Sequence, residues 1–287
     1  MPDPTLTNAE AFATRYPDAP ARFSIAVDTA LMKRDCLTRL ASELPPHLVE
    51  FNSGALPVSI EPEDVPTPAA RAEEIIARLD RDTVWMTLRN IEHNTDYRRL
   101  CDAVANALAG VAEAATGAML QRENFIFLSS AGAVTPFHID EEHNVLIQIE
   151  GRKTVRVFSQ HDRRLASQRD LEAFHAGGHR NLILDPAYAG DHQAFDLAPG
   201  DALYIPPLAP HWVSVAGDEP ALSLSITWRS EATRRAVYLH QINHRLRQFG
   251  ARPRFPGATP VRDQVKIWGA SALARLVTPF QRDRRGV

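Results

Sequence analysis

The stretch Thr135-Pro-Phe-His-Ile-Asp140 places a histidine and an aspartate two positions apart. Along a β-strand, residues at this spacing point to the same side, so His138 and Asp140 would present an imidazole and a carboxylate together. A second histidine, His211, follows Tyr204-Ile-Pro-Pro-Leu-Ala-Pro210 in another strand-rich region. Two histidines and one carboxylate can occupy one face of an octahedral Fe(II) and leave the other positions open for an oxidisable co-substrate and O₂. We therefore predict a metal centre at His138, Asp140 and His211.

An isolated His-x-Asp pair is common, and its simplest interpretation is a surface or hydrogen-bonded pair. A structural metal site would more often use four closed ligands, commonly with cysteine. The surrounding glycines favour an open metal site instead. Gly132 precedes His138 by six residues, Gly151 closes the following predicted strand, and Gly200 precedes Pro206 and His211.

This arrangement resembles the two cupin motifs, in which a glycine turn leads into paired ligands and a Gly-Pro turn leads to the last ligand. Within the cupins, the order and spacing of residues 135–153 and 199–206 resemble the Jumonji-C-like (JmjC) 2-oxoglutarate-dependent oxygenases. The resemblance is closest to the group that contains the asparaginyl hydroxylase modifying hypoxia-inducible factor. It covers about Asn124 to Trp228. One departure is Leu208, where many cupins have glycine, so this turn is expected to be shaped differently.

The resemblance implies three cofactors or co-substrates: Fe(II), 2-oxoglutarate and O₂. It also implies that Thr135 and Lys153 bind the distal carboxylate of 2-oxoglutarate. The pattern of the strand supports the lysine independently, because Lys153, Val155 and Val157 alternate onto one face. A buried ammonium is costly without an anion, which a dicarboxylate would supply. The alternative is a lysine at a strand entrance that bends into solvent.

Two further residues match cofactor-binding positions of the family. Asn144 corresponds to a position near the cofactor, although an amide at the barrel mouth would explain it equally well. Trp228 is expected at the barrel mouth beside His211, and plain core packing is the alternative.

The elements that must position these residues are short strands, which Gly, Pro, Asp or Asn separates in most cases. Their density, without a βαβ rhythm, predicts a sandwich or small barrel. With the resemblance, the fold class is mainly β with helical flanks, a double-stranded β-helix (cupin barrel). The predicted strands are Phe125–Ser129, Val145–Ile149, Thr154–Phe158, Asp201–Ile205, Trp212–Val215 and Leu222–Trp228.

Helical patterns flank this core and define three regions: an N-terminal α/β wrapping at 1–120, a catalytic core at 121–230, and a C-terminal helical extension at 231–287. The predicted flanking elements are helices at Asp28–Leu44, from Thr67-Pro68 past Leu79, at Thr95–Leu108, at Glu231–Phe249 and at Val265–Leu276, with a strand at Thr83–Leu88.

The composition of the chain excludes several classes of protein. No apolar run reaches the roughly 18 residues of a membrane span. The first ten residues lack the basic start and apolar stretch of a secretory signal. Cys36 and Cys101, the two cysteines, lie in predicted helices, so structural disulfides are not expected and the cytoplasm is the default compartment.

The C-terminal region is basic, with 13 Lys or Arg and three acidic residues from Arg229 onward. Such a region can bind nucleic acid, but a solvated helical face is the preferred interpretation. Its apolar stripe of Leu239, Ile242, Leu246 and Phe249 needs a covering surface. The resemblance implies pairing through C-terminal helices, so we expect a homodimer with this stripe near the interface. The alternative is that these helices fold back on their own chain.

The predicted function is an Fe(II)- and 2-oxoglutarate-dependent dioxygenase that hydroxylates a protein side chain or a small molecule. One alternative is a metal-binding cupin with non-oxidative small-molecule chemistry, against which Thr135 and Lys153 argue. The other is a regulatory, nucleic-acid-binding cupin that uses the basic C-terminal region.

Overall fold

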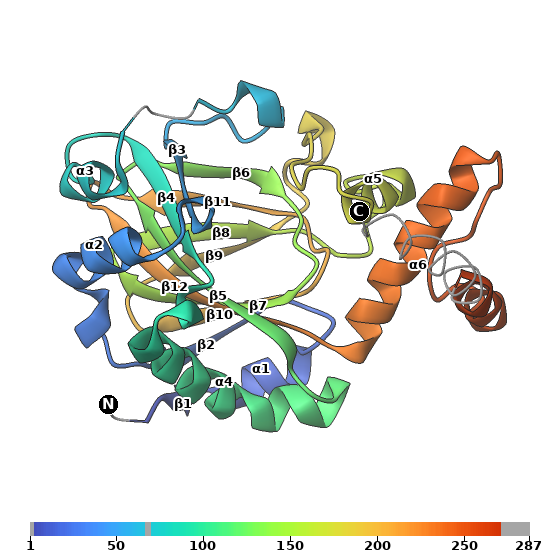
Figure 1. The fold of residues 1–287 in the computed structure, drawn as a ribbon, viewed down its shortest axis with the longest axis horizontal. Coiled ribbons are helices and arrows are strands. Elements are labelled where there is room, and N and C mark those ends of the chain that lie inside the picture. The colour runs from blue at the N-terminus through green and yellow to red at the C-terminus, as the bar shows by residue number, and fades with distance from the viewer. Residues whose placement is uncertain (1–2, 67–69, 271–287) are drawn as a thin grey trace, which may run out of the picture. The chain divides into compact units, whose positions relative to one another are not determined.

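Two antiparallel β-sheets form the framework of the computed structural model, which describes residues 3–66 and 70–270 (Figure 1). The larger sheet has the strand order β1-β2-β10-β7-β12-β5-β4-β3, and the smaller sheet has the order β6-β11-β8-β9. The strands are Thr5–Thr7 (β1), Ala21–Ala26 (β2), Val49–Ser53 (β3), Val84–Arg89 (β4), Leu120–Ser129 (β5), Val134–His138 (β6), His143–Glu150 (β7), Arg152–Val157 (β8), Gln193–Leu197 (β9), Asp201–Ile205 (β10), His211–Ala216 (β11) and Ala221–Arg229 (β12).

One face of the larger sheet packs against helices contributed by the N-terminal region. In β2 the buried positions alternate with exposed or half-buried ones, so Ala21, Phe23 and Ile25 share the helix-side core. Val145 and Ile147 of β7 extend the same core. The N-terminal helices are α1 (Ala9–Arg15), α2 (Arg34–Glu43), α3 (Ala72–Ala77) and α4 (Thr95–Thr116), with short 3₁₀ turns at Ala30–Met32, Pro46–Leu48, Pro62–Asp64 and Ile91–His93.

The other face of the larger sheet contributes to a smaller core with the four-stranded sheet. Leu146 of β7 meets Val155 and Val157 of β8 there. Because successive side chains of a strand alternate, Leu146 and its neighbours Val145 and Ile147 enter different cores. We call the surface that faces this smaller core the inner face. The predicted double-stranded β-helix is confirmed, with N-terminal strands β1 and β2 at one edge of the larger sheet and β3 and β4 at the other.

Every predicted strand is present, and Asp201–Ile205 has the predicted bounds. The predicted helix Asp28–Leu44 is divided, because the Asp28 carboxylate accepts the Ala30 N–H and Lys33 adopts an extended conformation between the 3₁₀ turn and α2. Helix α4 is longer than predicted and ends before Gly117, which has a φ of +74°. Asn94 caps its start by accepting the N–H groups of residues 96 and 97. The predicted helix start at Thr67-Pro68 lies outside the described residues.

Two compact units divide the chain, and their boundaries differ from the three predicted regions. Residues 1–165 and 180–231 form the first unit, which contains both sheets, and residues 166–179 and 232–287 form the second. Within the described residues, the second unit contains helix α5 (Gln168–His175), helix α6 (Glu231–Gln248) from its second residue onward, and a helical segment at 260–270. Arg247 of α6 binds both carboxylate oxygens of buried Glu172 on α5. The predicted helix Val265–Leu276 is seen up to residue 270, and its remainder lies outside the described residues.

None of the helices in the described part of the chain has the length and apolar character needed to cross a membrane.

The turn between β7 and β8 depends on Gly151, which has a φ of +65°. A Cβ atom at this position would lie 2.2 Å from the Pro220 carbonyl oxygen. Gly132 has a similar φ of +70°, but a Cβ there would meet nothing within 4 Å.

We expect Gly151→Ala to destabilise the fold more than Gly132→Ala does. Both variants incur the backbone cost of the left-handed region, about 1–3 kcal/mol. Gly151→Ala adds a steric overlap with backbone, worth roughly another 1–3 kcal/mol. Denaturant unfolding of both variants measures the difference, and equal losses of unfolding free energy would contradict the close approach of Gly151 to Pro220.

Candidate metal centre

The register between β6 and β11 places His138 directly opposite His211. Their imidazole ring centroids lie 4.1 Å apart, and both side chains are buried. His211 is also opposite Val157 of β8, whose side chain belongs to the inner-face core. Directly opposed residues share a face, so both histidines lie on the inner face.

Backbone carbonyls fix the orientation of both imidazoles. The Nδ1 atom of His138 lies 2.7 Å from the Pro136 carbonyl oxygen, and that of His211 lies 2.9 Å from the Ala209 carbonyl oxygen. A carbonyl only accepts, so Nδ1 is the donor and carries the proton in each neutral ring. The lone pair is therefore on Nε2, the atom available to a metal.

Asp140 completes the group from the loop just beyond β6. Its Oδ2 atom lies 3.6 Å from Nε2 of His138 and 3.7 Å from Nε2 of His211. Its Oδ1 atom accepts a hydrogen bond of 3.0 Å from Nη1 of Arg180. Asp140 is also held through its backbone, because its carbonyl oxygen accepts the Leu208 N–H at 2.7 Å.

The protonation states of the group suit a metal ligand set. Burial opposes ionisation of Asp140, but the neighbouring His138 and Arg180 outweigh it and hold the pKa of that carboxyl well below its usual range. Burial, assisted by His138, lowers the pKa of His211 to about 3. A neutral imidazole and an ionised carboxylate are the forms that bind metals.

Among residues 3–66 and 70–270, His138, Asp140 and His211 form the one group of three or more potential ligands whose donor atoms lie within 4.8 Å of one another. Such a set holds an octahedral divalent ion from one side and leaves positions for other ligands. The structure thus brings together the three residues that the sequence singled out.

Lys153 lies on β8 opposite Leu197 and Val215, and it shares the inner face with Val155 and Val157. The side chain is buried, with 4% of the residue exposed, and its Nζ lies 5.8 Å from the centroid of the Phe127 ring. Burial lowers the pKa of this ammonium to about 7. No anionic partner of Lys153 occurs among the described residues.

Thr135 reaches the inner face because β6 contains a bulge. The step from His138 to Thr135 spans three residues, whereas the opposing step from His211 to Val213 spans two. Thr135 therefore lies opposite Val213, which packs against the inner-face core. In a regular strand, residues three apart would point to opposite sides.

Asn144 also lies on the inner face, next to Leu146 on β7. Its Oδ1 atom accepts a 2.8 Å hydrogen bond from the Ser225 hydroxyl, which fixes the amide orientation and directs Nδ2 away from that serine.

Trp228 does not lie beside the metal centre, contrary to the expectation that it binds cofactor. It is fully buried in the helix-side core, and its indole N–H lies 3.4 Å from the Tyr16 hydroxyl. Its place on β12 alternates with Ser225 and Thr227, so it faces away from Asn144. The imidazole of His143 stacks on Trp228 with 5.5 Å between ring centroids and is buried.

Sequence reasoning missed two arginines near the ligands. Arg180 approaches from a loop distant in the sequence, and no local pattern marks it. Arg229, at the end of β12, pairs with Glu141 and, at 2.6 Å, with Glu142. The two glutamates directly follow Asp140. Three adjacent carboxylates require a nearby cation, and this was the signal in the sequence that could have pointed to an arginine here. Leu208 has a φ of +60°, in the left-handed region that glycine favours, so the leucine does not prevent a glycine-like turn at this position.

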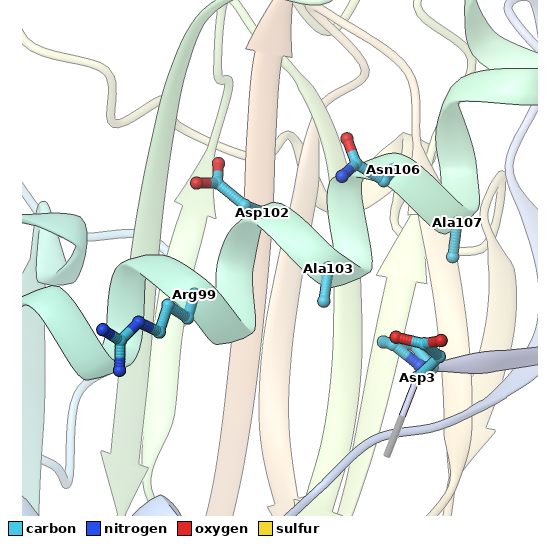
Figure 2. A pocket seen from close by; sticks show the side chains of 7 residues that line it. Asp3, Arg99, Asp102, Ala103, Asn106 and Ala107 are labelled. Carbon is cyan, nitrogen blue, oxygen red and sulfur yellow. The ribbon is translucent and has the colours of Figure 1, made fainter. Parts of the chain in front are cut away.

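A surface hollow of the described chain lies away from the ligand group. It has a volume of about 470 Å³ and lies between α4 and the start of the described chain. Figure 2 shows Ala103 and Ala107 directed from α4 towards Asp3, whereas Asp102 points away from it. Asp102 is paired with Arg122 at 3.1 Å.

Comparisons with known proteins agree with this fold. The sequence profile of the JmjC domain matches residues 109–235. This range includes the ligand group of His138, Asp140 and His211, and also Thr135 and Lys153. A lysine-specific demethylase 8 from Danio rerio is 30% identical over 103 residues, 34% of this chain and 25% of its own length. This chain therefore spans about a quarter of that relative.

Solved structures share the fold. The X-ray structure of Escherichia coli ycfD has a TM-score of 0.55 and 20% identity, over 96% of this chain and 69% of that one. The complex of the E. coli ribosomal oxygenase YcfD with cobalt and 2-oxoglutarate has a TM-score of 0.53 and 20% identity, over 96% and 68%. Residues 109–235 thus match the model of the JmjC domain, and the two-sheet framework agrees with the fold of these solved structures.

Proposed function

We propose that this chain is an Fe(II)- and 2-oxoglutarate-dependent dioxygenase whose metal is held by His138, Asp140 and His211. The observation that carries the proposal is the buried Lys153, a cation without an anionic partner in the described chain, on the same inner face as the ligand group. A buried charge of this kind is costly unless a ligand supplies the counter-charge.

The donor set fits iron. Two nitrogen donors and one carboxylate are typical of non-haem Fe(II) oxygenases, whereas four closed ligands would indicate a structural metal. The E. coli YcfD structure is described as a complex with both cobalt and 2-oxoglutarate. Both observations support the same two groups here.

The inner face also fits 2-oxoglutarate. The Lys153 ammonium and the Thr135 hydroxyl would bind its distal carboxylate, one by a charge-assisted hydrogen bond and the other by a neutral one. The Asn144 amide, whose Oδ1 is already engaged by Ser225, would offer its N–H donors to the same ligand. Trp228 is not part of this proposal.

Iron, 2-oxoglutarate and O₂ together supply the oxidation, with succinate, CO₂ and an oxidised substrate as products. The residues of the chain provide orientation and exclude water. His138 and His211 keep their Nδ1 protons on backbone carbonyls throughout, so neither imidazole acts as a general base. Lys153 neutralises the distal carboxylate and holds the co-substrate in one orientation.

A protein side chain is the substrate class that we favour. The related structures are described as ribosomal oxygenases, and the curated relative as a lysine-specific demethylase. A small molecule is the second candidate. The resemblance of residues 135–153 to the asparaginyl hydroxylase group remains a prediction from sequence.

Two other functions have less support. A non-oxidative cupin would have no use for the buried cation at Lys153. A nucleic-acid-binding role is favoured by the charge of the second unit, where Arg234, Arg235, Arg245, Arg252, Arg254 and Arg262 are exposed. The intact ligand group argues against a barrel that has lost its chemistry. We place the protein in the cytoplasm because both cysteines are free.

A homodimer through the second unit is part of the proposal. Phe249 of α6 is 90% exposed, and Trp268 of the 260–270 segment is 66% exposed. Large exposed side chains of this kind are typical of interaction surfaces. Leu239, by contrast, is buried within the single chain, so only the C-terminal part of the predicted stripe is available to a second copy. Leu246, Val261 and Val265 are the other exposed apolar residues there.

With Fe(II), ascorbate and O₂ but no added substrate, we expect the protein to convert 2-oxoglutarate to succinate slowly. His211→Ala removes one of the ligands, so succinate formation should fall at least about 100-fold. The matched control is His192→Ala, a histidine outside the ligand group. Succinate is measured by mass spectrometry, and equal turnover by both variants would contradict the assigned site.

Lys153→Ala should weaken 2-oxoglutarate binding by about 10- to 150-fold, because it removes a charge-assisted hydrogen bond worth roughly 1.5–3 kcal/mol. Thr135→Val should cost less. Isothermal titration of the Mn(II)-loaded protein measures both. An unchanged dissociation constant for Lys153→Ala would move the anchor elsewhere.

The same titration should depend on pH. Burial lowers the pKa of unliganded Lys153 to about 7, and the bound dicarboxylate requires the protonated ammonium. Affinity is therefore full below pH 7 and falls by up to about tenfold per unit as the pH rises further. Lys153→Ala should lose this dependence.

Light scattering tests the dimer. A mass near twice 31.9 kDa is expected at micromolar concentration. Phe249→Glu should give the monomer without unfolding, and Ile183→Glu, at an exposed apolar residue of the first unit, should not. A mass of one chain for the unaltered protein would refute the dimer.

A further inference from the structure

Arg180 divides the two oxygens of Asp140 between different partners. Its Nη1 atom donates to Oδ1 at 3.0 Å, whereas Oδ2 faces Nε2 of His138 at 3.6 Å and Nε2 of His211 at 3.7 Å. Only Oδ2 therefore points to the position where a metal would lie between the imidazoles.

The backbone of Arg180 is held by the strand that carries the ligands. Its carbonyl oxygen accepts the Ile139 N–H at 3.1 Å, and the Leu182 N–H donates to the Phe137 carbonyl at 2.9 Å. Asn181 forms an isolated β-bridge with His138. Residues 180–182 thus continue the ladder beside β6, and the position of Arg180 does not depend on the ion pair alone.

We propose that Arg180 is a positioning residue that restricts Asp140 to coordination through one oxygen. The inference rests on the proposed function. An octahedral ion with three protein donors and a two-donor co-substrate has one position left for O₂. A carboxylate that coordinated through both oxygens would occupy that position. By engaging Oδ1, Arg180 keeps the position for O₂ available.

The surroundings of Arg180 are consistent with this role. Its guanidinium has five N–H donors, and the hydrogen bond to Asp140 is the interaction that the described structure shows for it. Its side chain is 38% exposed, so it lies at the accessible side of the ligand group. No other cation contacts the Asp140 carboxylate among residues 3–66 and 70–270.

Cobalt(II) substitution tests the proposal, because the visible absorption of bound cobalt reports the number and arrangement of its ligands. The variants are Arg180→Met, which removes the donor and the charge, and Arg180→Lys, which keeps both on a shorter side chain. Arg164→Met is the matched control, since Arg164 is also exposed and pairs with a carboxylate, Asp191, at 3.0 Å. Circular dichroism and a metal-to-protein ratio of one verify that each variant is folded and loaded.

We expect Arg180→Met to bind cobalt but to change its visible spectrum before any 2-oxoglutarate is added. With Fe(II), its conversion of 2-oxoglutarate to succinate should fall at least about tenfold, the lower end of the usual effect of residues behind a metal ligand, because the position for O₂ would be occupied. Arg180→Lys should restore most of both properties, and Arg164→Met should match the unaltered protein.

An Arg180→Met cobalt spectrum and rate of succinate formation identical to those of the unaltered protein would overturn the proposal while leaving the proposed function intact. If the unaltered protein itself bound neither cobalt nor 2-oxoglutarate, the proposed function would fail and the role of Arg180 would fail with it. A Lys variant as defective as the Met variant, although folded and loaded with metal, would also count against the proposal, because a restored cation and donor should hold Oδ1.

Discussion

The pairing of β6 with β11 is the constraint on which the site depends. It sets His138 opposite His211, and the bulge in β6 lets Thr135 share their face although it is three residues from His138. A shift of this register by one residue would turn the histidines away from each other. The ladder continues on the other side of β6 through residues 180–182, which bring Arg180 to Asp140. The three metal ligands, Thr135 and the arginine behind Asp140 thus take their positions from β6 and the segments paired with it on either side.

The alternation of side chains separates stability from chemistry in this fold. On β7, Val145 and Ile147 enter the helix-side core, while Asn144 and Leu146 face the other sheet. On β12, Trp228 packs with Tyr16 and His143, and Ser225 contacts Asn144. A large core that includes four N-terminal helices therefore holds the strands, and the smaller inner face can accommodate polar groups such as Lys153. The cost of burying that lysine is acceptable only if a ligand offsets it.

The sequence predicted the barrel and the convergence of His138, Asp140 and His211, because strand periodicity and glycine turns are local signals. It also placed Lys153 inside, since valines follow it at alternate positions. The expectation that Trp228 lies beside His211 was wrong. It came from the resemblance, whereas the alternation of Leu222, Leu224, Ile226 and Trp228 with Ser223, Ser225 and Thr227 along β12 already favours core packing. Arg180 could not be predicted, since its contact with Asp140 joins segments 40 positions apart through tertiary structure. Edge strand β9 was missed because three of its five residues are exposed and only Leu197 is buried, which leaves no clear apolar alternation.

The central claim is that one inner face binds Fe(II) and 2-oxoglutarate together. The most direct measurement is the visible absorption of the protein mixed anaerobically with both. If 2-oxoglutarate coordinates iron held by His138, Asp140 and His211, a charge-transfer band should develop in the unaltered protein, saturate at one equivalent of iron and disappear in Asp140→Ala. No band at saturating Fe(II) and 2-oxoglutarate, or an equal band in Asp140→Ala, would contradict the account.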